Sequence, residues 1–196
     1  LVLTNGGGAV TSTPPATLTL VPTNGTPYES AVLGADPIAY WRLNEFANPS
    51  TNPPAYDFAG GLAGKYETVS SNGFNDIAGP RPTDWPGFEA TNRAVEITGG
   101  TSNSWVTVPA LNVNTNRMTM TAWIYPVGAQ SDWCGLFFTR TDTTVAGIHY
   151  GGVGNGTGGQ LAYTWNGITD DAGNTWAFFS DLYIPSDQWS FVAAVI

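Results

Sequence analysis

Charged side chains are scarce in this chain of 196 residues, making up 11% of it against roughly a quarter in ordinary globular proteins. Lys65 is the only lysine, and six basic residues against fifteen acidic ones leave a formal net charge of -9. Nucleic acids and acidic lipid surfaces are bound by patches of lysine and arginine. The sequence therefore predicts no nucleic-acid partner and no binding to acidic membranes.

Histidine and cysteine are nearly absent, with His149 and Cys134 as the single examples. One cysteine cannot form an internal disulfide, and one histidine with one cysteine cannot supply the usual ligand set of zinc. The chain has no Gly-x-Ser-x-Gly sequence around a nucleophilic serine, and His149 stands in a strand-like run. We therefore predict that the protein is not an enzyme.

Long apolar runs are missing as well, since no stretch approaches the ~18 residues of a membrane span, and we predict no membrane insertion. What the chain does have is 42% hydrophobic residues, including eight Trp, eight Tyr and nine Phe, which is enough to build a core. It begins at Leu1 without a signal peptide and stops at Ile196 inside an apolar run. We expect this sequence to be a β-rich, acidic segment of a longer protein.

Short β-type runs separated by Gly, Asn, Pro and Thr follow one another along most of the chain. In the run 118–123 the apolar residues occupy even positions, which predicts one core face and one wet face. A helical pattern is confined to Tyr28–Leu33 and ends before Pro37. Many short strands with Gly-rich turns predict an all-β, antiparallel β-sandwich or jelly roll. The expected strands are 38–43, 65–69, 94–97, 105–108, 118–125, 135–140, 145–150, 161–165 and 189–196.

Residues 1–22 are expected to form a terminal β-hairpin, with strands at Leu1–Thr4 and Ala16–Leu20 and a turn at Asn5–Gly8. The segment Thr4–Ser12 followed by Ala16–Leu20 resembles the last two strands of bacterial immunoglobulin-like domains. Residues 23–27 follow Pro22 and end with Pro27; this polar stretch, stiffened by two prolines, predicts a linker. Residues 28–196 would then form a second domain.

Five motifs in residues 28–196 stand in an order found in one known family. They are Pro37–Glu45 (PIAYWRLNE), Tyr56–Gly64 (YDFAGGLAG), Met118–Pro126 (MTMTAWIYP), Leu161–Asn166 (LAYTWN) and Ile184–Ala193 (IPSDQWSFVA). This part of the chain resembles the laminin-G-like jelly-roll domains of the concanavalin A-like lectin and glucanase fold, as found in large exported bacterial proteins. Members continue past the last motif with further strands, so the resemblance implies a C-terminally truncated jelly roll. Its open edge would need a continuation or a partner.

The resemblance implies an extracellular or cell-surface protein and raises the question of glycoside cleavage. Glucanases of this fold carry Glu-x-Asp-x-x-Glu on one strand, and no glutamate of this chain begins that spacing. We therefore expect a non-catalytic glycan-binding or adhesive module of an extracellular multidomain protein. Its partners would be a glycan or cell-surface polysaccharide and neighbouring domains of the same chain. The alternative is a structural bead of a surface fibre or stalk, and a glycoside-active enzyme is a distant third.

Sugar binding needs aromatic platforms for the apolar faces of pyranose rings and polar groups for the hydroxyls. Such residues gather in the second half of the chain, where the predicted ligand-binding residues are Trp165, Trp176, Asn166, Tyr150 and Asp142. Trp165 fits a core position equally well, whereas Trp176 stands beside a polar loop. The wider candidate group adds Trp133, His149 and Tyr163, and the tryptophans inside the family motifs, Trp41, Trp123 and Trp189, are expected in the core.

Asp57 is the candidate metal ligand, with calcium as the cofactor. Domains of the resembled family often hold calcium near the rim of the sandwich through the aspartate to which Asp57 corresponds, and calcium prefers oxygen ligands. The alternative is that Asp57 caps the turn before Gly60 and Gly61, as aspartate commonly does. A second acidic stretch, 170–174, lacks the ligand spacing of a calcium loop and predicts a solvated turn.

Overall fold

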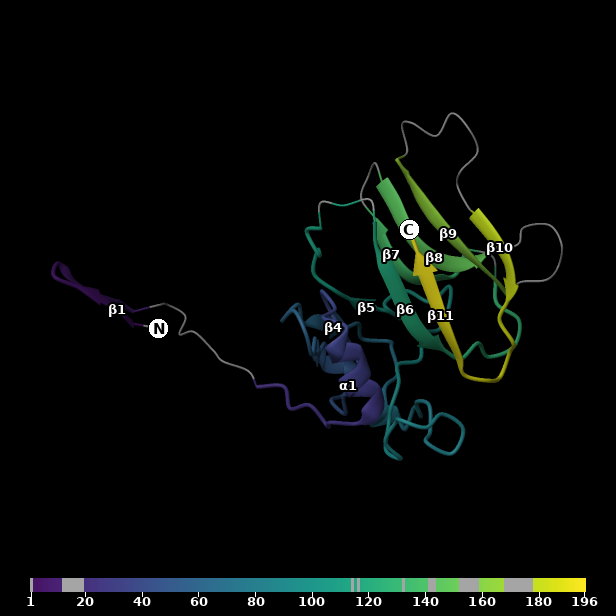
Figure 1. Ribbon diagram of the computed structural model, residues 1–196, viewed down its shortest axis with the longest axis horizontal. Coiled ribbons are helices and arrows are strands. Elements are labelled where there is room, and N and C mark those ends of the chain that lie inside the picture. The colour runs from purple at the N-terminus through teal and green to yellow at the C-terminus, as the bar shows by residue number, and fades with distance from the viewer. Residues whose placement is uncertain are drawn as a thin grey trace.

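The computed structural model describes residues 2–11, 20–113, 115, 117–131, 133–140, 144–151, 159–167 and 178–196. These residues are mostly β, with antiparallel strands in four separate sheets, no closed barrel and one short α-helix (Figure 1). The elements are β1 (Val2–Asn5), β2 (Gly8–Thr11), α1 (Pro27–Gly34), the 3-10 turns Pro49–Thr51 and Gly73–Asn75, β3 (Pro54–Ala55), β4 (Gly64–Tyr66), β5 (Val106–Thr107), β6 (Thr119–Ile124), β7 (Gly135–Arg140), β8 (Thr144–Gly151), β9 (Gln160–Gly167), β10 (Phe178–Tyr183) and β11 (Ser190–Val195).

An N-terminal hairpin forms, with its first strand close to the predicted position and its second strand at Gly8–Thr11. β1 pairs with β2 in the register Val2 to Thr11, and the two-residue turn Gly6-Gly7 joins them. A two-residue turn rich in glycine is the tightest connection between antiparallel strands. Of the predicted second strand, residues 16–19 lie outside the described residues, and Leu20 has no strand conformation and is exposed.

Helix α1 confirms the predicted helical segment. The side chain of Thr26 caps it by accepting a hydrogen bond from the Glu29 amide at 3.3 Å, and Pro27 occupies its first turn. The ring of Tyr28 stacks on Phe88 with 4.3 Å between centroids and lies edge-on to Trp123. Through these rings the helix is attached to β6.

A charged group lies buried beneath α1. The guanidinium of Arg42 pairs with Glu29 at 3.3 Å and with Glu89, and the side chains of Arg42 and Glu29 are 5% and 1% exposed. The Gly25 amide also donates to Glu29 at 2.7 Å. One arginine therefore joins three segments that lie far apart in the sequence.

A second group of buried polar side chains lies at the small antiparallel sheet, in which β4 pairs with β3 on one side and β5 on the other. Tyr66 in β4 is completely buried and donates its hydroxyl hydrogen to the Glu45 carboxylate, which also accepts from the Tyr56 amide at 2.8 Å. Burial, reinforced by the adjacent Glu45 carboxylate, raises the pKa of Tyr66, so its hydroxyl stays protonated and donates. Asn72, also fully buried, donates to the Ala47 carbonyl at 3.0 Å.

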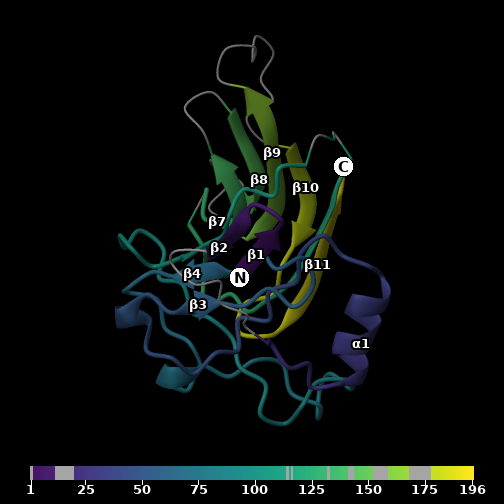
Figure 2. The same cartoon turned by 90° about the vertical axis from the view of Figure 1, so that its left-hand side faces the viewer.

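The longer strands form two sheets, one with the order β10-β9-β8-β7 and one that pairs β11 with β6. They face each other across an apolar core of Met120, Ile148, Leu161 and Val192. Figures 1 and 2 show the β6–β11 pair lying against the larger sheet, with the loops before residue 113 gathered near one end of the strands. Met120 and its even-numbered neighbours in β6 face this core, which confirms the face predicted from alternation.

Several predicted strands differ from the structure. Residues 38–43 form only an isolated bridge, Trp41 to Asp57, and residues 94–97 form only the bridge Ser71 to Glu96. Both runs have the apolar residues of strands. Hydrogen bonds that involve side chains, to Asp57 and to Leu62, position residues 38–43, whereas backbone hydrogen bonds with Ser71 and Ile77 hold residues 94–97. β10 was not predicted, since its residues Phe178–Tyr183 do not alternate in polarity.

Candidate functional site

One face of β8 carries a distinctive series of residues, Gly147, His149 and Gly151, at alternate positions. Side chains at alternate positions of a strand share a face. Ile148 lies on the other face, in the core between the two sheets, so this series lies on the outer face of the larger sheet. Two of its three positions carry no side chain, which leaves room for side chains from neighbouring strands.

Aromatic rings fill that room. A methyl group added at Gly147 would lie 2.1 Å from the Phe137 carbonyl oxygen and 2.7 Å from the Phe138 ring, and one added at Gly151 would lie 2.5 Å from the Phe179 ring. Phe138 in β7 is paired with Gly147, and Phe179 in β10 lies on the far side of β9. Each glycine therefore lets a phenylalanine from another strand pack against the backbone of β8.

Trp133 supplies a third ring between these two. Its indole stacks on the His149 imidazole, with 5.1 Å between centroids and 21° between planes, and the side chain is 50% exposed. Phe138 and Phe179 are also exposed, at 38% and 39%. We call Trp133, Phe138 and Phe179 the aromatic strip; it lies across the outer face of β8.

The backbone of Trp133 has a φ of 67°, in the left-handed region. A bulky residue in this conformation costs on the order of 1–3 kcal/mol, which the surrounding structure must offset. The Trp133 amide donates to the Tyr150 carbonyl at 2.8 Å, and the Tyr150 amide donates to the Cys134 carbonyl at 2.9 Å. These bonds hold the turn that presents the indole to solvent.

His149 supports the aromatic strip and has no ring nitrogen free for catalysis. It is fully buried, with Nδ1 2.9 Å from the Tyr150 carbonyl oxygen and Nε2 3.0 Å from the Thr164 hydroxyl. A carbonyl oxygen only accepts, so Nδ1 carries a proton and donates it. Its hydrogen bonds fix the orientation of the imidazole, and the Trp133 ring stacks on it.

Of the five predicted ligand residues, Tyr150 is the one whose side chain the structure describes. Tyr150 is 3% exposed, and burial raises its pKa to about 12, so little of its ring is left for a ligand to touch. Trp165 and Asn166 are in β9, where their backbones pair with Ala146 and Val145. Asp142 and Trp176 lie outside the described residues. The ligand roles of all five stay predictions.

Asp57 organises a turn. Its Oδ1 accepts hydrogen bonds from the amides of Tyr40 at 2.7 Å and Ala59 at 2.9 Å, and its Oδ2 accepts from Gly60 at 3.1 Å and Leu62 at 2.8 Å. Burial opposes ionisation of Asp57, but these four donors outweigh it, so its pKa is lowered from 3.8.

The surroundings of Asp57 do not fit a calcium site. A carboxylate offers about four lone-pair directions, and four amides already occupy those of Asp57. Within the part of the chain that the structure describes, no group of three or more His, Cys, Asp or Glu side chains could hold a metal ion. Asp57 fits the turn-capping alternative, and its role as a calcium ligand stays a prediction.

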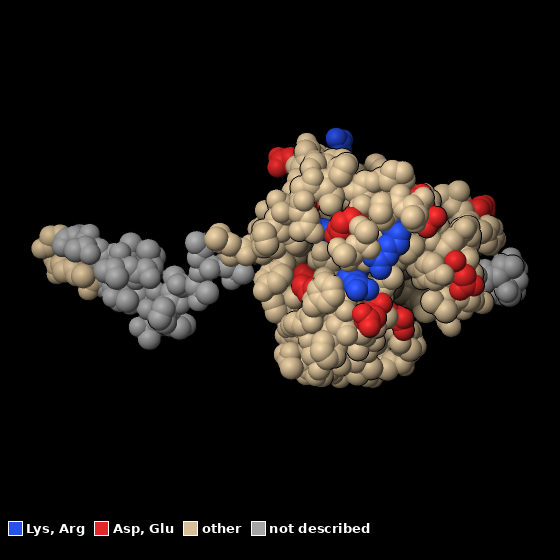
Figure 3. Space-filling model, turned by 90° about the horizontal axis from the view of Figure 1, so that it is seen from below, with Lys and Arg blue, Asp and Glu red and all other residues tan. Residues whose placement is uncertain are grey.

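Two further features are the charge on the surface and the length of the helices. On the face seen in Figure 3 the basic side chains lie beside acidic ones, and most of the surface carries no charge. Arg93, for example, lies 3.7 Å from Asp76. Of the helices among the described residues, none is long and apolar enough to cross a membrane.

Comparison with protein-family models, with curated proteins and with solved structures finds no match to this chain. The resemblance to laminin-G-like and immunoglobulin-like domains therefore stays a prediction based on its motifs.

Phe138 and Phe179 were missed as site residues because apolar residues in strands are expected in the core. A signal for them does exist in the sequence: Gly-x-His-x-Gly within a strand run leaves bare backbone on one face, and bare backbone invites a close approach by a large side chain. The partner strands that supply the rings cannot be deduced from that signal.

Proposed function

We propose that this protein is a non-catalytic glycan-binding module with a jelly-roll architecture, belonging to an extracellular multidomain protein. The observation that carries the proposal is Trp133, which is half exposed although its backbone is held at a φ of 67°. A conformation that costs stability and is kept in place by neighbours is a recognised mark of a functional position. Exposed aromatic rings suit the apolar faces of sugars.

The spacing of the aromatic strip supports an extended ligand. Trp133, Phe138 and Phe179 pack over three alternate positions of β8, and alternate residues of a strand are about 7 Å apart. A chain of sugar rings could lie on successive aromatic side chains, whereas a single small molecule would need an enclosed pocket. We therefore expect an oligosaccharide or cell-surface polysaccharide rather than a monosaccharide.

The strip also argues for binding without catalysis. His149, the only histidine, has both ring nitrogens engaged, and the strip itself consists of three side chains without acid or base chemistry. Glycoside hydrolysis needs two carboxyl groups flanking the scissile bond. The proposed ligand would be held and released unchanged.

A glycan array probed with the 196-residue chain, in calcium and in chelator, tests the proposal. We expect binding to one or more oligosaccharides, and Trp133→Gly should weaken it at least tenfold in titration calorimetry. Glycine accepts a left-handed φ without strain, so this variant should keep its melting temperature while losing the ring.

Trp105→Ala is the matched control, because Trp105 is similarly exposed, at 44%, and lies outside the strip. It should bind as the unchanged chain does. Absence of binding to every glycan under both conditions would overturn the proposal and favour the structural-bead alternative. A melting temperature that is the same in excess calcium and in chelator would remove Asp57 as a metal ligand.

A further inference from the structure

Arg93 carries a charge that has no close partner within the described part of the chain. Its side chain is 22% exposed, and Oδ1 of Asp76 lies 3.7 Å from its Nη2, beyond hydrogen-bond distance. Its Nε is buried and has no hydrogen-bond partner among the described residues. A mostly buried guanidinium in such surroundings is costly, and a polar group left in this way calls for an explanation.

Arg42 shows what a paired guanidinium looks like in the same region. It bonds to Glu29 and Glu89, and its side chain is 5% exposed. Arg93 instead lies over the ring of Phe46, 5.4 Å from the ring centroid. A cation–π contact uses the face of the guanidinium, whereas its N–H donors lie in the plane. The edge of the Arg93 guanidinium can therefore still bond to an acceptor supplied by a ligand.

The backbone and the stem of Arg93 are held in place by close packing. Arg93 forms an isolated bridge with Ala78, and next to it the Gly79 amide donates to the Asn92 carbonyl at 3.1 Å. A methyl group added at Gly73 would lie 3.2 Å from Cγ of Arg93, so the stem packs against this glycine. A donor that is already positioned loses less entropy when a ligand binds.

Two exposed phenylalanine rings accompany Arg93. Phe46, beneath the guanidinium, is 59% exposed, and Phe74, which directly follows Gly73, is 54% exposed. We call Phe46, Phe74 and Arg93 the Arg93 site. It combines an apolar aromatic surface with a planar cation that can bond to two oxygens of one anion.

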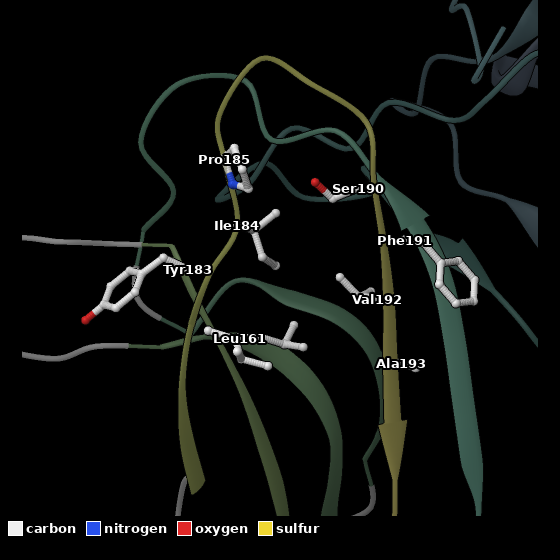
Figure 4. A pocket seen from close by; sticks show the side chains of 9 residues that line it. Leu161, Tyr183, Ile184, Pro185, Ser190, Phe191, Val192 and Ala193 are labelled. Carbon is white, nitrogen blue, oxygen red and sulfur yellow. The ribbon is translucent and has the colours of Figure 1, made fainter. Parts of the chain in front are cut away.

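The apolar pocket between β10 and β11 offers a different chemistry. It has a volume of about 280 Å³, and Leu161, Ile184 and Val192 point into it (Figure 4). None of the described residues that line it is charged. An anion would lose its water there without gaining a charged partner. The Arg93 site is therefore the better place for an anionic ligand.

We propose that the Arg93 site binds a carboxylate-bearing sugar, a uronic acid residue of an acidic polysaccharide, independently of the aromatic strip. The guanidinium donates two parallel hydrogen bonds to the two carboxylate oxygens of the sugar. The apolar face of the pyranose ring lies against the phenylalanine rings. The sugar carboxylate takes the place of the Asp76 carboxylate, which is 92% exposed and held only at 3.7 Å.

Charge favours a carboxylate over a phosphate at this site. The chain carries a net charge of -9, and Asp76 lies beside the guanidinium. A phosphate monoester carries about -1.5 to -2 at pH 7, whereas a carboxylate carries a single charge, so the phosphate is repelled more strongly. Asp76 itself is almost fully exposed, so water screens its charge and it moves aside at little cost.

Titration calorimetry of the 196-residue chain with trigalacturonic acid and with its methyl ester tests the proposal. We expect the acid to bind at least about tenfold more tightly than the ester, because esterification removes the charges and keeps the rings. Inorganic phosphate should bind more weakly than the acid. Raising the salt concentration should weaken binding of the acid.

Variants of the Arg93 site show which group recognises the carboxylate. Arg93→Met should weaken binding of the acid about tenfold or more, and Arg93→Lys should recover part of the loss, since it restores the charge without the planar pair of donors. Arg117→Met is the matched control, because it removes the same charge from an exposed arginine outside the site, and it should bind as the unchanged chain does. Asp76→Asn should tighten binding by removing the competing carboxylate.

The two sites are tested separately by Trp133→Gly. Arg93 and the residues that contact it lie between positions 46 and 93, whereas the aromatic strip lies between positions 133 and 179. Trp133→Gly should therefore keep the Arg93-dependent binding of trigalacturonic acid, and Arg93→Met should keep the binding that depends on Trp133. Loss of the Arg93-dependent binding in Trp133→Gly would overturn the independence of the two sites.

The remaining outcomes bear on the ligand itself. Absence of binding to trigalacturonic acid, equal affinity for the acid and the ester, or an equal loss in Arg93→Met and Arg117→Met would overturn the proposal. Weaker binding by Asp76→Asn would overturn the displacement of Asp76. An acidic peptide that binds through Arg93 more tightly than the trisaccharide would overturn the choice of a sugar. Melting temperatures close to that of the unchanged chain show that the variants have folded.

Discussion

The strands between residues 20 and 113 are two or three residues long, whereas those between residues 119 and 195 have six or eight. The first region is held by buried polar side chains: Arg42 with Glu29 and Glu89, Glu45 with Tyr66, and Asp57 with four amides. The second is held by an apolar core between two sheets. Long loops can be held in place when their buried polar groups are each supplied with partners.

The two regions should therefore respond differently to the loss of one side chain. Removing one member of a buried polar group leaves the others without a partner in a low dielectric, and the cost of desolvation then falls on the groups that remain. Removing methyl groups from a core leaves a cavity whose cost depends on how far the neighbours relax.

Arg42→Met should be the most damaging. It leaves the buried carboxylates of Glu29 and Glu89 without their cation, which we expect to lower the free energy of unfolding by about 3–5 kcal/mol. Urea denaturation measures the loss, and hydrogen exchange should show it first in residues 20–113. The triple variant Arg42→Met, Glu29→Gln, Glu89→Gln should recover part of it. A loss below about 1 kcal/mol would mean that these charges contribute little to the fold.

Ile148→Ala tests the second region. Ile148 is 2% exposed in the centre of the core, and truncation there should cost about 3 kcal/mol through lost burial and the cavity left behind. The milder Ile148→Val should cost about 1 kcal/mol. Raised hydrogen exchange should be greatest in β8, β9 and β6. Equal changes in hydrogen exchange throughout residues 20–113 would show that the two regions unfold as one unit.

Asp57→Asn should cost about 2 kcal/mol, because the amide nitrogen of asparagine cannot accept hydrogen bonds from the backbone donors that one carboxylate oxygen now serves. Thermal unfolding measures the change. Asp76→Asn is the control, since the Asp76 side chain is 92% exposed and should matter little. If both variants melt alike, Asp57 does not organise its turn.

Lowering the pH should change the free energy of unfolding least, and part of that change should depend on Asp57. Because the folded pKa of Asp57 lies below its usual 3.8, its contribution is complete above that value and is lost as the pH falls through the lower folded pKa. The difference in free energy of unfolding between the unchanged chain and Asp57→Asn should therefore shrink below about pH 4. A difference that stays constant to pH 2 would contradict the lowered pKa.

How much the sequence predicts also differs between the regions. Alternation in residues 118–125 predicts β6 and its core face, and β7, β8, β9 and β11 lie close to their expected positions. In the first region the expected strands 38–43 and 94–97 reduce to isolated bridges. Strand periodicity is a local signal, whereas the Arg42–Glu89 pair joins residues 47 apart, and no local pattern encodes it.

The candidate site shows the same limit. Aromatic residues in the second half of the chain predict where a sugar-binding surface would lie, and Trp133 belongs to that group. The sequence does not reveal that Trp133 has a left-handed backbone, that Tyr150 is buried, or that Phe138 and Phe179 flank His149. Exposure and proximity depend on which strands pair and in which register, and a one-residue shift would exchange the two faces.

By itself the sequence determined a β-rich, acidic chain with few charges, one short helix and strands whose apolar residues alternate, because composition and period-two patterning act locally. Only the tertiary structure decided which carboxylates would be buried with Arg42 and which face of β8 would carry aromatic rings. Those outcomes depend on contacts between residues far apart in the chain. Such contacts are set by which strands pair, and in which register, rather than by local sequence.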